Sequence, residues 1–133
     1  MTKKKILVID DEVAFARMVK LNLEDTGQYE VRVENRGSKG LAAAKEFMPD
    51  LIFLDIVMPD MDGGEVCRQI GMDQKLKDIP IVFLTEIMTE AETAIRKTVM
   101  GGHPLMAKPV DKEKLVECIQ KNMKTPGIGG VSK

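Results

Sequence analysis

Several residue types are scarce in this chain, and each scarcity excludes a class of protein. The 133 residues include no tryptophan, one tyrosine, one histidine and two cysteines. Cys67 and Cys118 lie far apart without the spacing of metal ligands, which argues against a disulfide framework and against a zinc site built on cysteine pairs. We interpret both as reduced thiols, and His103 as a loop residue rather than a metal ligand.

The chain also lacks an excess of positive charge and any long apolar run. Lysine and arginine number 20 against 21 aspartate and glutamate, so binding of nucleic acid by this chain is not expected. The apolar run 6–9 that follows the lysines at 3–5 is too short for a signal peptide, and no run approaches membrane-spanning length. Together with the reduced thiols, these absences favour a cytoplasmic protein.

What the chain does contain is enough apolar residues for one core. With 44% hydrophobic and 31% charged residues, a chain of this length is expected to form one globular domain. Short apolar runs rich in β-branched residues alternate with segments whose apolar residues recur at steps of three and four. Strands are predicted at 6–9, 31–33, 51–54, 81–84 and, more weakly, 105–107, and helices from near Phe15, Leu41, Gly64, Thr89 and Lys112.

This alternation predicts βαβ units and therefore an α/β fold with a mostly parallel sheet. Polar and apolar residues alternate over residues 29–34, which indicates a strand at the edge of the sheet. In the second helix, Ser38 is a candidate N-cap, Met48 lies on the apolar face and Pro49 ends the helix. Residues 125–133, rich in glycine, are expected to form a flexible tail or the start of a linker.

Polar residues that can carry chemistry follow the carboxyl ends of four predicted strands. Asp10 and Asp11 follow the first strand, Asp55 the third, Thr85 the fourth and Lys108 the fifth. In an open parallel sheet this edge holds the ligand-binding crevice, so we expect these side chains to form one pocket. Each residue alone has a simpler explanation as a helix cap, a turn residue or a solvated charge, but their shared location favours a functional site.

The charges of these residues indicate what the pocket holds. Three carboxylates brought close together repel one another and raise each other's pKa unless a hard cation lies among them, and Mg²⁺ or Mn²⁺ fits such oxygen ligands. A lysine and a hydroxyl beside that cation are useful if an anion also binds, and a phosphoryl group would contact all of these groups. Asp55 remains as the nucleophile, which predicts an aspartyl phosphate.

Four motifs, in this order, resemble the receiver domain of response regulators in two-component signalling. They are V-I-D-D-E at 8–12, L-D-I-V-M-P-D-M-D-G at 54–63, F-L-T at 83–85 and K-P at 108–109, and the resemblance covers residues 3–123. It implies a (βα)5 doubly wound fold, with helices on both faces of a five-stranded parallel sheet in the order 2-1-3-4-5.

The resemblance also implies a role for each pocket residue. Asp55 would be the phosphoacceptor, Thr85 the switch hydroxyl and Lys108 the phosphate-binding lysine, and the peptide bond before Pro109 would be cis. These roles come from the matching positions of the motifs and not from spacing alone.

A magnesium site is implied at the same positions. Asp11 would bind the ion directly, together with the carboxylate of Asp55 and the backbone carbonyl of Val57. Asp10 would help to hold the ion through water. The resulting set of oxygen ligands and waters is the kind that Mg²⁺ prefers.

Such a receiver domain would take a phosphoryl group from the phosphohistidine of a histidine kinase or a phosphotransfer protein onto Asp55. It would be a switch rather than an enzyme, apart from slow loss of its own phosphoryl group. The surface formed by residues 85–115 would change and bind a downstream protein that the sequence does not name. The domain would span residues 1–124 and be a monomer or a weak homodimer.

The sequence departs from the family pattern near the pocket. Leu105 stands where receivers usually carry an aromatic residue coupled to the threonine, and Glu86 stands where they usually carry a small residue. These two residues leave open the alternative of an adaptor that binds partners without phosphorylation. Val57 and Ile87 replace polar residues that in some receivers position the hydrolytic water, which predicts a longer-lived phosphoryl group.

Overall fold

The computed structural model describes residues 2–86 and 102–123. The predicted helix at 89–100, Ile87 and the predicted tail at 125–133 lie outside these residues. No helix within the described part is long and apolar enough to cross a membrane. The elements in chain order are β1 (Lys4–Ile9), α1 (Val13–Asp25), β2 (Tyr29–Glu34), the 3₁₀ helix η1 (Gly37–Lys39), α2 (Gly40–Phe47), β3 (Leu51–Asp55), α3 (Gly63–Gly71), β4 (Ile81–Thr85), β5 (Leu105–Ala107) and α5 (Lys112–Asn122).

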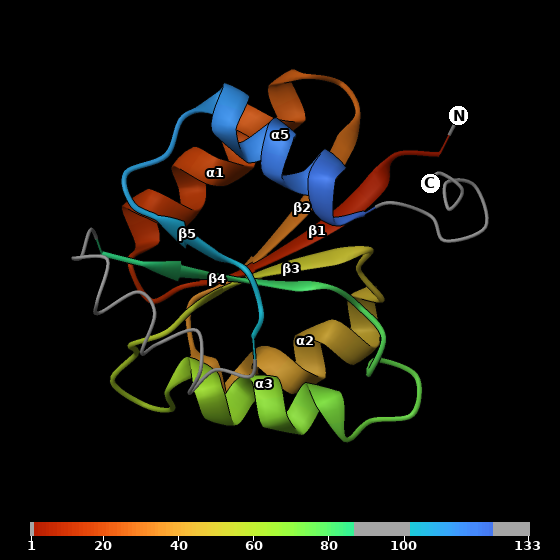
Figure 1. Cartoon of the computed structure of the whole chain (residues 1–133), viewed down its shortest axis with the longest axis vertical. Helices are drawn as coiled ribbons and strands as arrows, with labels where there is room; N and C mark the ends of the chain where they lie inside the picture. Colours follow the sequence, from red (N-terminus) through yellow and green to blue (C-terminus); the bar gives the residue numbers. More distant parts are fainter. Residues whose placement is uncertain (1, 87–101, 124–133) are drawn as a thin grey trace.

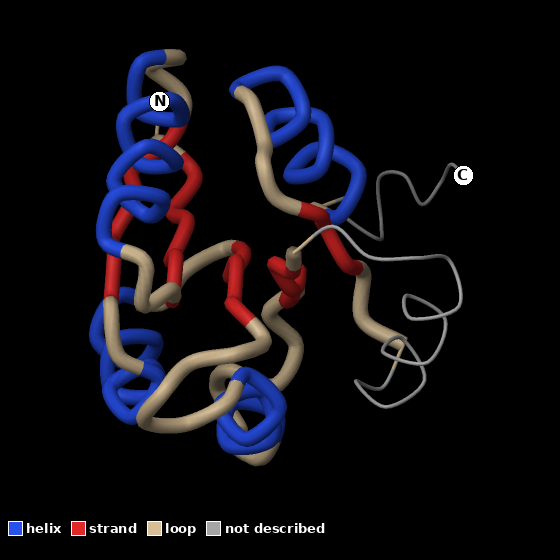
Figure 2. Tube along the Cα trace, turned by 90° about the vertical axis from the view of Figure 1, so that its left-hand side faces the viewer, coloured by secondary structure: helices blue, strands red, loops and turns tan. Residues whose placement is uncertain are grey.

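The five strands form one parallel sheet in the order β2-β1-β3-β4-β5. Helices α1 and α5 cover one face of the sheet, and α2 and α3 cover the other (Figure 1). The view turned by 90° shows the strands between these two helical layers (Figure 2). Both the doubly wound α/β fold and the strand order 2-1-3-4-5 are therefore confirmed.

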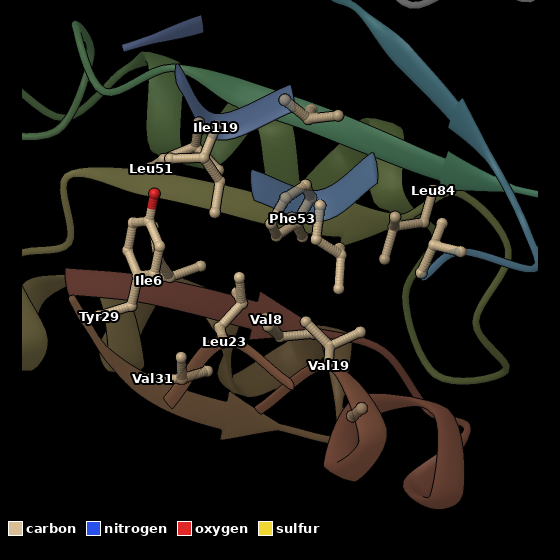
Figure 3. Packing of buried hydrophobic residues seen from close by; sticks show 14 residues of the cluster. Ile6, Val8, Val19, Leu23, Tyr29, Val31, Leu51, Phe53, Leu84 and Ile119 are labelled. Atoms are coloured by element: carbon tan, nitrogen blue, oxygen red, sulfur yellow. The ribbon is translucent and has the colours of Figure 1, made fainter. Parts of the chain in front are cut away.

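The central strands are buried on both faces, which explains why their sequences are continuously apolar. Successive side chains point to opposite faces of the sheet. Val8 and Phe53 pack with Leu23 of α1 and Ile119 of α5 in one core cluster (Figure 3). Their neighbour Leu54 points the other way, into the cluster beneath α2 and α3. The core thus fixes the register of the strands and the positions at which they end.

Strand β2 lies at one edge of the sheet, as its alternating sequence predicts. Tyr29 and Val31 are buried against the cluster beneath α1, whereas Glu30 between them is exposed. One face of β2 is covered by the core and the other is exposed to solvent, which explains the alternation of polar and apolar residues.

The prediction of Ser38 as the N-cap of the second helix is wrong. Ser38 lies inside η1, and its hydroxyl donates a hydrogen bond to the Asp60 carboxylate at 2.6 Å. Helix α2 begins at Gly40, and the preceding Lys39 makes no side-chain cap. The Ser38 hydroxyl therefore bonds to a carboxylate from a distant loop and does not cap the helix, contrary to what the local sequence pattern indicates.

The placement of Met48 on the apolar face of the second helix is also wrong. Helix α2 ends at Phe47, and Met48 has a left-handed backbone with φ of 50°. Met48 is 43% exposed. The residue before a proline is disfavoured in the helical conformation, so Pro49 ends the helix one residue earlier than the apolar spacing indicates.

Candidate functional site

Four polar or charged side chains are buried in the described part of the protein, and all four follow or end a strand on the same edge of the sheet. Asp10 follows β1, Asp55 and Thr85 end β3 and β4, and Lys108 follows β5. Their exposed fractions are 0%, 7%, 6% and 7% respectively. Burial of polar groups lowers stability, so the presence of four such groups at one edge of the sheet indicates a functional site.

Backbone hydrogen bonds hold the strand ends side by side. The amide of Ile56 donates to the carbonyl of Leu84 at 3.2 Å, and the amide of Lys108 donates to the carbonyl of Thr85 at 2.7 Å. The Lys108–Pro109 peptide bond is cis. The side chains of β3, β4 and the residue after β5 are thus placed by the sheet itself.

Asp10, Asp11 and Asp55 form the acidic group that the sequence predicts. One carboxylate oxygen of each lies within 4.8 Å of the others. The buried Oδ2 atom of Asp10 has no polar partner among the described residues other than Lys108 Nζ, with which it forms an ion pair at 3.0 Å. Three converging carboxylates, one of them fully buried, fit a divalent cation such as Mg²⁺.

Burial and mutual repulsion disfavour the charged forms of two of these carboxylates. Burial, followed by the charge of Asp10, raises the pKa of Asp55 to about 7, against a smaller opposite influence of Lys108. Burial also raises the pKa of Asp10, although the backbone amide of Glu12 and the ammonium of Lys108 oppose it. The site is therefore short of positive charge.

Lys108 is the buried cation of this site. Its Nζ atom forms ion pairs with Asp10 Oδ2 at 3.0 Å and with Asp55 Oδ1 at 3.8 Å, and a short one with Glu12 Oε1. It also lies 4.5 Å from the centre of the Phe15 ring. Burial lowers the pKa of Lys108, but the ion pairs with Glu12 and Asp10 more than offset this effect and leave the pKa raised.

The side chains surround a cleft of about 380 Å³ at the edge of the sheet. Val57 is 67% exposed, and Glu86 is also exposed. Leu105 is not among the lining residues and packs against the core beneath α2 and α3. The lining residues are Asp11, Glu12, Asp55, Ile56, Val57, Thr85, Glu86 and Lys108.

The loop after β3 is tied to the segment after β2. The carboxylate of Asp60 accepts hydrogen bonds from the amides of Gly37 at 3.1 Å and Ser38 at 3.0 Å, and from the Ser38 hydroxyl. The Ser38 bonds lower the pKa of Asp60 to about 2. One wall of the cleft is thereby connected to η1.

For two residues that contact Lys108, the sequence predicts no role in the site. Glu12 forms an ion pair with Lys108 across 96 positions of the chain, and Phe15 places its ring beneath the same ammonium. Glu12 stands in the acidic run after β1, which is a weak signal, while the spacing of Phe15 indicates only a core face. Neither pairing can be found from local sequence.

The chain matches the family described as "Response regulator receiver domain" over residues 6–120. The chain belongs to this family. The receiver is 32% identical over 115 residues to protein PilH of Pseudomonas aeruginosa, covering 86% of this chain and 93% of that protein. It is 37% identical over 112 residues to the DNA-binding dual master transcriptional regulator RpaA of a Synechocystis strain, covering 84% of this chain.

Solved structures agree with this family. Chemotaxis protein CheY4 of Vibrio cholerae superposes on the receiver with a TM-score of 0.81 and 30% identity, covering 91% of this chain and 99% of that chain. The receiver spans 46% of the length of RpaA and 42% of that of the regulator PhoP of Bacillus subtilis. The receiver domain is a phosphoacceptor module of two-component signalling.

Proposed function

We propose that Asp55 is the residue that accepts the phosphoryl group. The observation that supports this assignment is that three of the four buried polar side chains, those of Asp55, Thr85 and Lys108, line one cleft. Thr85 and Lys108 lie on the neighbouring strand ends and supply a hydroxyl and an ammonium for phosphoryl oxygens. The nucleophile and its partners are therefore held by the sheet before any donor arrives.

We propose that the acidic group binds Mg²⁺ or Mn²⁺. Asp11 and Asp55 would be direct ligands with the backbone carbonyl of Val57, and Asp10 would act through water. When bound, the cation supplies positive charge for the phosphoryl oxygens. The raised pKa of Asp55, which reflects burial and the charge of Asp10, supports the need for such a cation.

The reaction is a displacement at phosphorus. The P–N bond of a phosphohistidine breaks as a carboxylate oxygen of Asp55 forms a P–O bond, and the imidazole leaves with the electron pair of the broken bond. Lys108 pairs with the charge on the transferring group, and the Thr85 hydroxyl donates a hydrogen bond to a phosphoryl oxygen. Little other chemistry is required of the protein, because positioning and charge carry the reaction.

Membership of a two-component family implies a histidine kinase as partner, and a histidine phosphotransfer protein would serve equally well as the donor. We place the receiver in the cytoplasm as a monomer or weak homodimer, with its boundary near residue 124. The response would appear at residues 85–115, where an unidentified protein target binds. Part of this surface lies outside the described residues.

The experiment that tests the assignment is intact mass spectrometry after incubation with acetyl phosphate and Mg²⁺. The wild type is expected to gain one phosphate, while Asp55→Asn gains none because its amide is a poor nucleophile. Omitting Mg²⁺ and adding a chelator should also prevent the gain.

A phosphate gained equally by Asp55→Asn would contradict the choice of nucleophile. No phosphate in any sample, even with phosphorylated histidine kinases as donors, would favour the adaptor that works without phosphorylation. Glu86, an exposed acidic residue that lines the cleft, is the feature that this second function has in its favour.

The phosphoryl group is expected to last longer than in receivers with polar residues at positions 57 and 87. Val57 lines the cleft with an apolar side chain, which cannot orient the attacking water. Val57→Asn should therefore shorten the half-life of the phosphorylated protein severalfold, as measured by the decay of the phosphate adduct after the donor is removed.

Val13→Asn is the matched control, because Val13 is a similarly exposed valine that does not line the cleft. It should leave the half-life unchanged. A wild-type half-life of seconds in magnesium buffer would show that the apolar residues do not protect the phosphoryl group.

A further inference from the structure

Three carboxylates compete for one ammonium in this site. Lys108 pairs with Asp10, Asp55 and Glu12, and it is the buried lysine of the described chain. An ammonium group has three protons to donate, and the Phe15 ring occupies a further side of it. An incoming phosphoryl oxygen can therefore reach Lys108 only if an existing partner is displaced.

Glu12 differs from the other two carboxylates in its surroundings. Asp10 and Asp55 are buried and belong to the acidic group that fits a cation. Glu12 is outside that group, and its side chain is 54% exposed. Once a cation binds Asp55 and its neighbours, Glu12 is the partner of Lys108 that can turn into water at least cost.

We propose that Glu12 is a positioning residue that holds Lys108 in the unphosphorylated receiver and competes with the phosphoryl group for it. This inference rests on the proposed role of Asp55 as phosphoacceptor. Glu12 keeps the ammonium beside the acidic group, and a phosphoryl group, with about 1.5 to 2 negative charges, displaces it. Release of Glu12 toward solvent is then part of binding the donor.

The competition has a kinetic signature. Glu12 opposes the donor before the reaction, whereas Lys108 makes the same contact in the transition state once Glu12 has left. Loss of the Glu12 charge should therefore lower the donor concentration that gives half the maximal rate and leave the maximal rate unchanged.

The test compares Glu12→Gln with Glu30→Gln and the wild type. The probe is acetyl phosphate at a series of concentrations with saturating Mg²⁺, in which acetate leaves as Asp55 forms its bond to phosphorus. Glu12→Gln should need about two- to fivefold less acetyl phosphate for half-maximal rate, the range expected for an ion pair whose carboxylate is exposed to solvent. Glu12 makes no side-chain cap to α1, so the amide should not disturb the helix.

Glu30→Gln removes the same charge from an exposed position on β2 and should behave as the wild type. Equal effects of the two variants would mean that only net charge matters and would overturn the proposal. An unchanged half-saturating concentration, or a change confined to the maximal rate, would overturn it as well.

A second measurement separates this inference from the assignment of Asp55. In the protein without metal or donor, the ammonium resonance of Lys108 in a lysine NMR spectrum should shift in Glu12→Gln but not in Glu30→Gln. An unshifted resonance would overturn the Glu12–Lys108 pairing even if Asp55 is phosphorylated. A shifted resonance in a receiver that accepts no phosphate would support the pairing and overturn the proposed function instead.

Discussion

In metal-free buffer, raising the pH from about 5 to about 7 is expected to lower the free energy of unfolding by about 2 kcal/mol. The cause is Asp55, whose pKa is raised from its ordinary 3.8 to about 7 by burial and by the charge of Asp10. Between these values the folded protein binds a proton that the unfolded chain does not. This contribution is greatest below the unfolded pKa and is lost as the pH rises through the folded one.

The pKa of Asp10 is also raised by burial, so Asp10 acts in the same direction as Asp55, whereas Asp60 and Glu24 do not produce this trend. The pKa of Asp60 is lowered to about 2 by its bonds to Ser38, so its contribution to stability is lost only as the pH falls below about 4. The pKa of Glu24 is also lowered: the amide of Val31 and the ammonium of Lys20 outweigh the opposing influence of burial. Both act at the acid end, away from the range in which Asp55 loses its proton.

The measurement is urea unfolding of the wild type and Asp55→Asn across this pH range in a chelating buffer. The variant cannot ionise at this position, so most of the fall in stability should disappear and the variant should be the more stable protein at about pH 7. Parallel curves for the two proteins would show that Asp55 does not titrate in this range.

Mg²⁺ should reverse the loss at neutral pH. A ligand at about 100 times its dissociation constant that binds only the folded state stabilises it by about 2.7 kcal/mol. Asp55→Asn should lose most of this gain, because one of the three converging carboxylates is gone. Equal stabilisation of the two proteins would place the ion elsewhere.

Gly63→Ala is expected to destabilise the domain by about 2 to 3 kcal/mol and to impair phosphorylation. A Cβ atom at this position would overlap the carbonyl oxygen of Asp55 and lie 3.0 Å from Cα of Ile56. Both are backbone atoms of the strand end, and the amide of Gly63 donates to the Ile56 carbonyl at 2.7 Å. The chain can therefore admit the methyl group only by moving the segment that carries Asp55.

Gly71→Ala is the matched control, since a Cβ atom there would have no atom within 4 Å. It lies at the end of the same helix, and alanine is the better helix former, so stability should be unchanged or slightly higher. Urea unfolding and phosphate uptake from acetyl phosphate should be measured on both variants. Wild-type stability and uptake in Gly63→Ala would contradict the close approach.

The parts of the site that local sequence predicts well are those carried by strand ends. The apolar run that ends at Asp55 marks both the strand and the edge to which it points, because parallel strands end together. The same argument places Thr85 and Lys108, and the sheet brings the three to one cleft. The apolar runs and the polar or turn residues that end them indicate these positions, and both are features of local sequence.

Contacts between distant segments could not be predicted in this way. Ser38 looks like a helix cap until Asp60, far along the chain, accepts its hydroxyl. In the local sequence Glu12 is one more charged residue at the start of a helix, and only the fold brings Lys108, which follows the last strand, into contact with it. Such pairings depend on loop paths, which tertiary packing decides and short patterns do not encode.

The bond between Asp60 and η1 has a consequence for the direction in which the domain responds. The wall of the cleft beside β3 is fastened to η1 at Gly37 and Ser38, whereas the backbone of Thr85 on the other wall is held by the neighbouring strand end through the amide of Lys108. Charge that enters the cleft therefore acts on two walls that are held differently, one by a loop and the other by the sheet. We expect the two walls to respond unequally to phosphorylation for this reason.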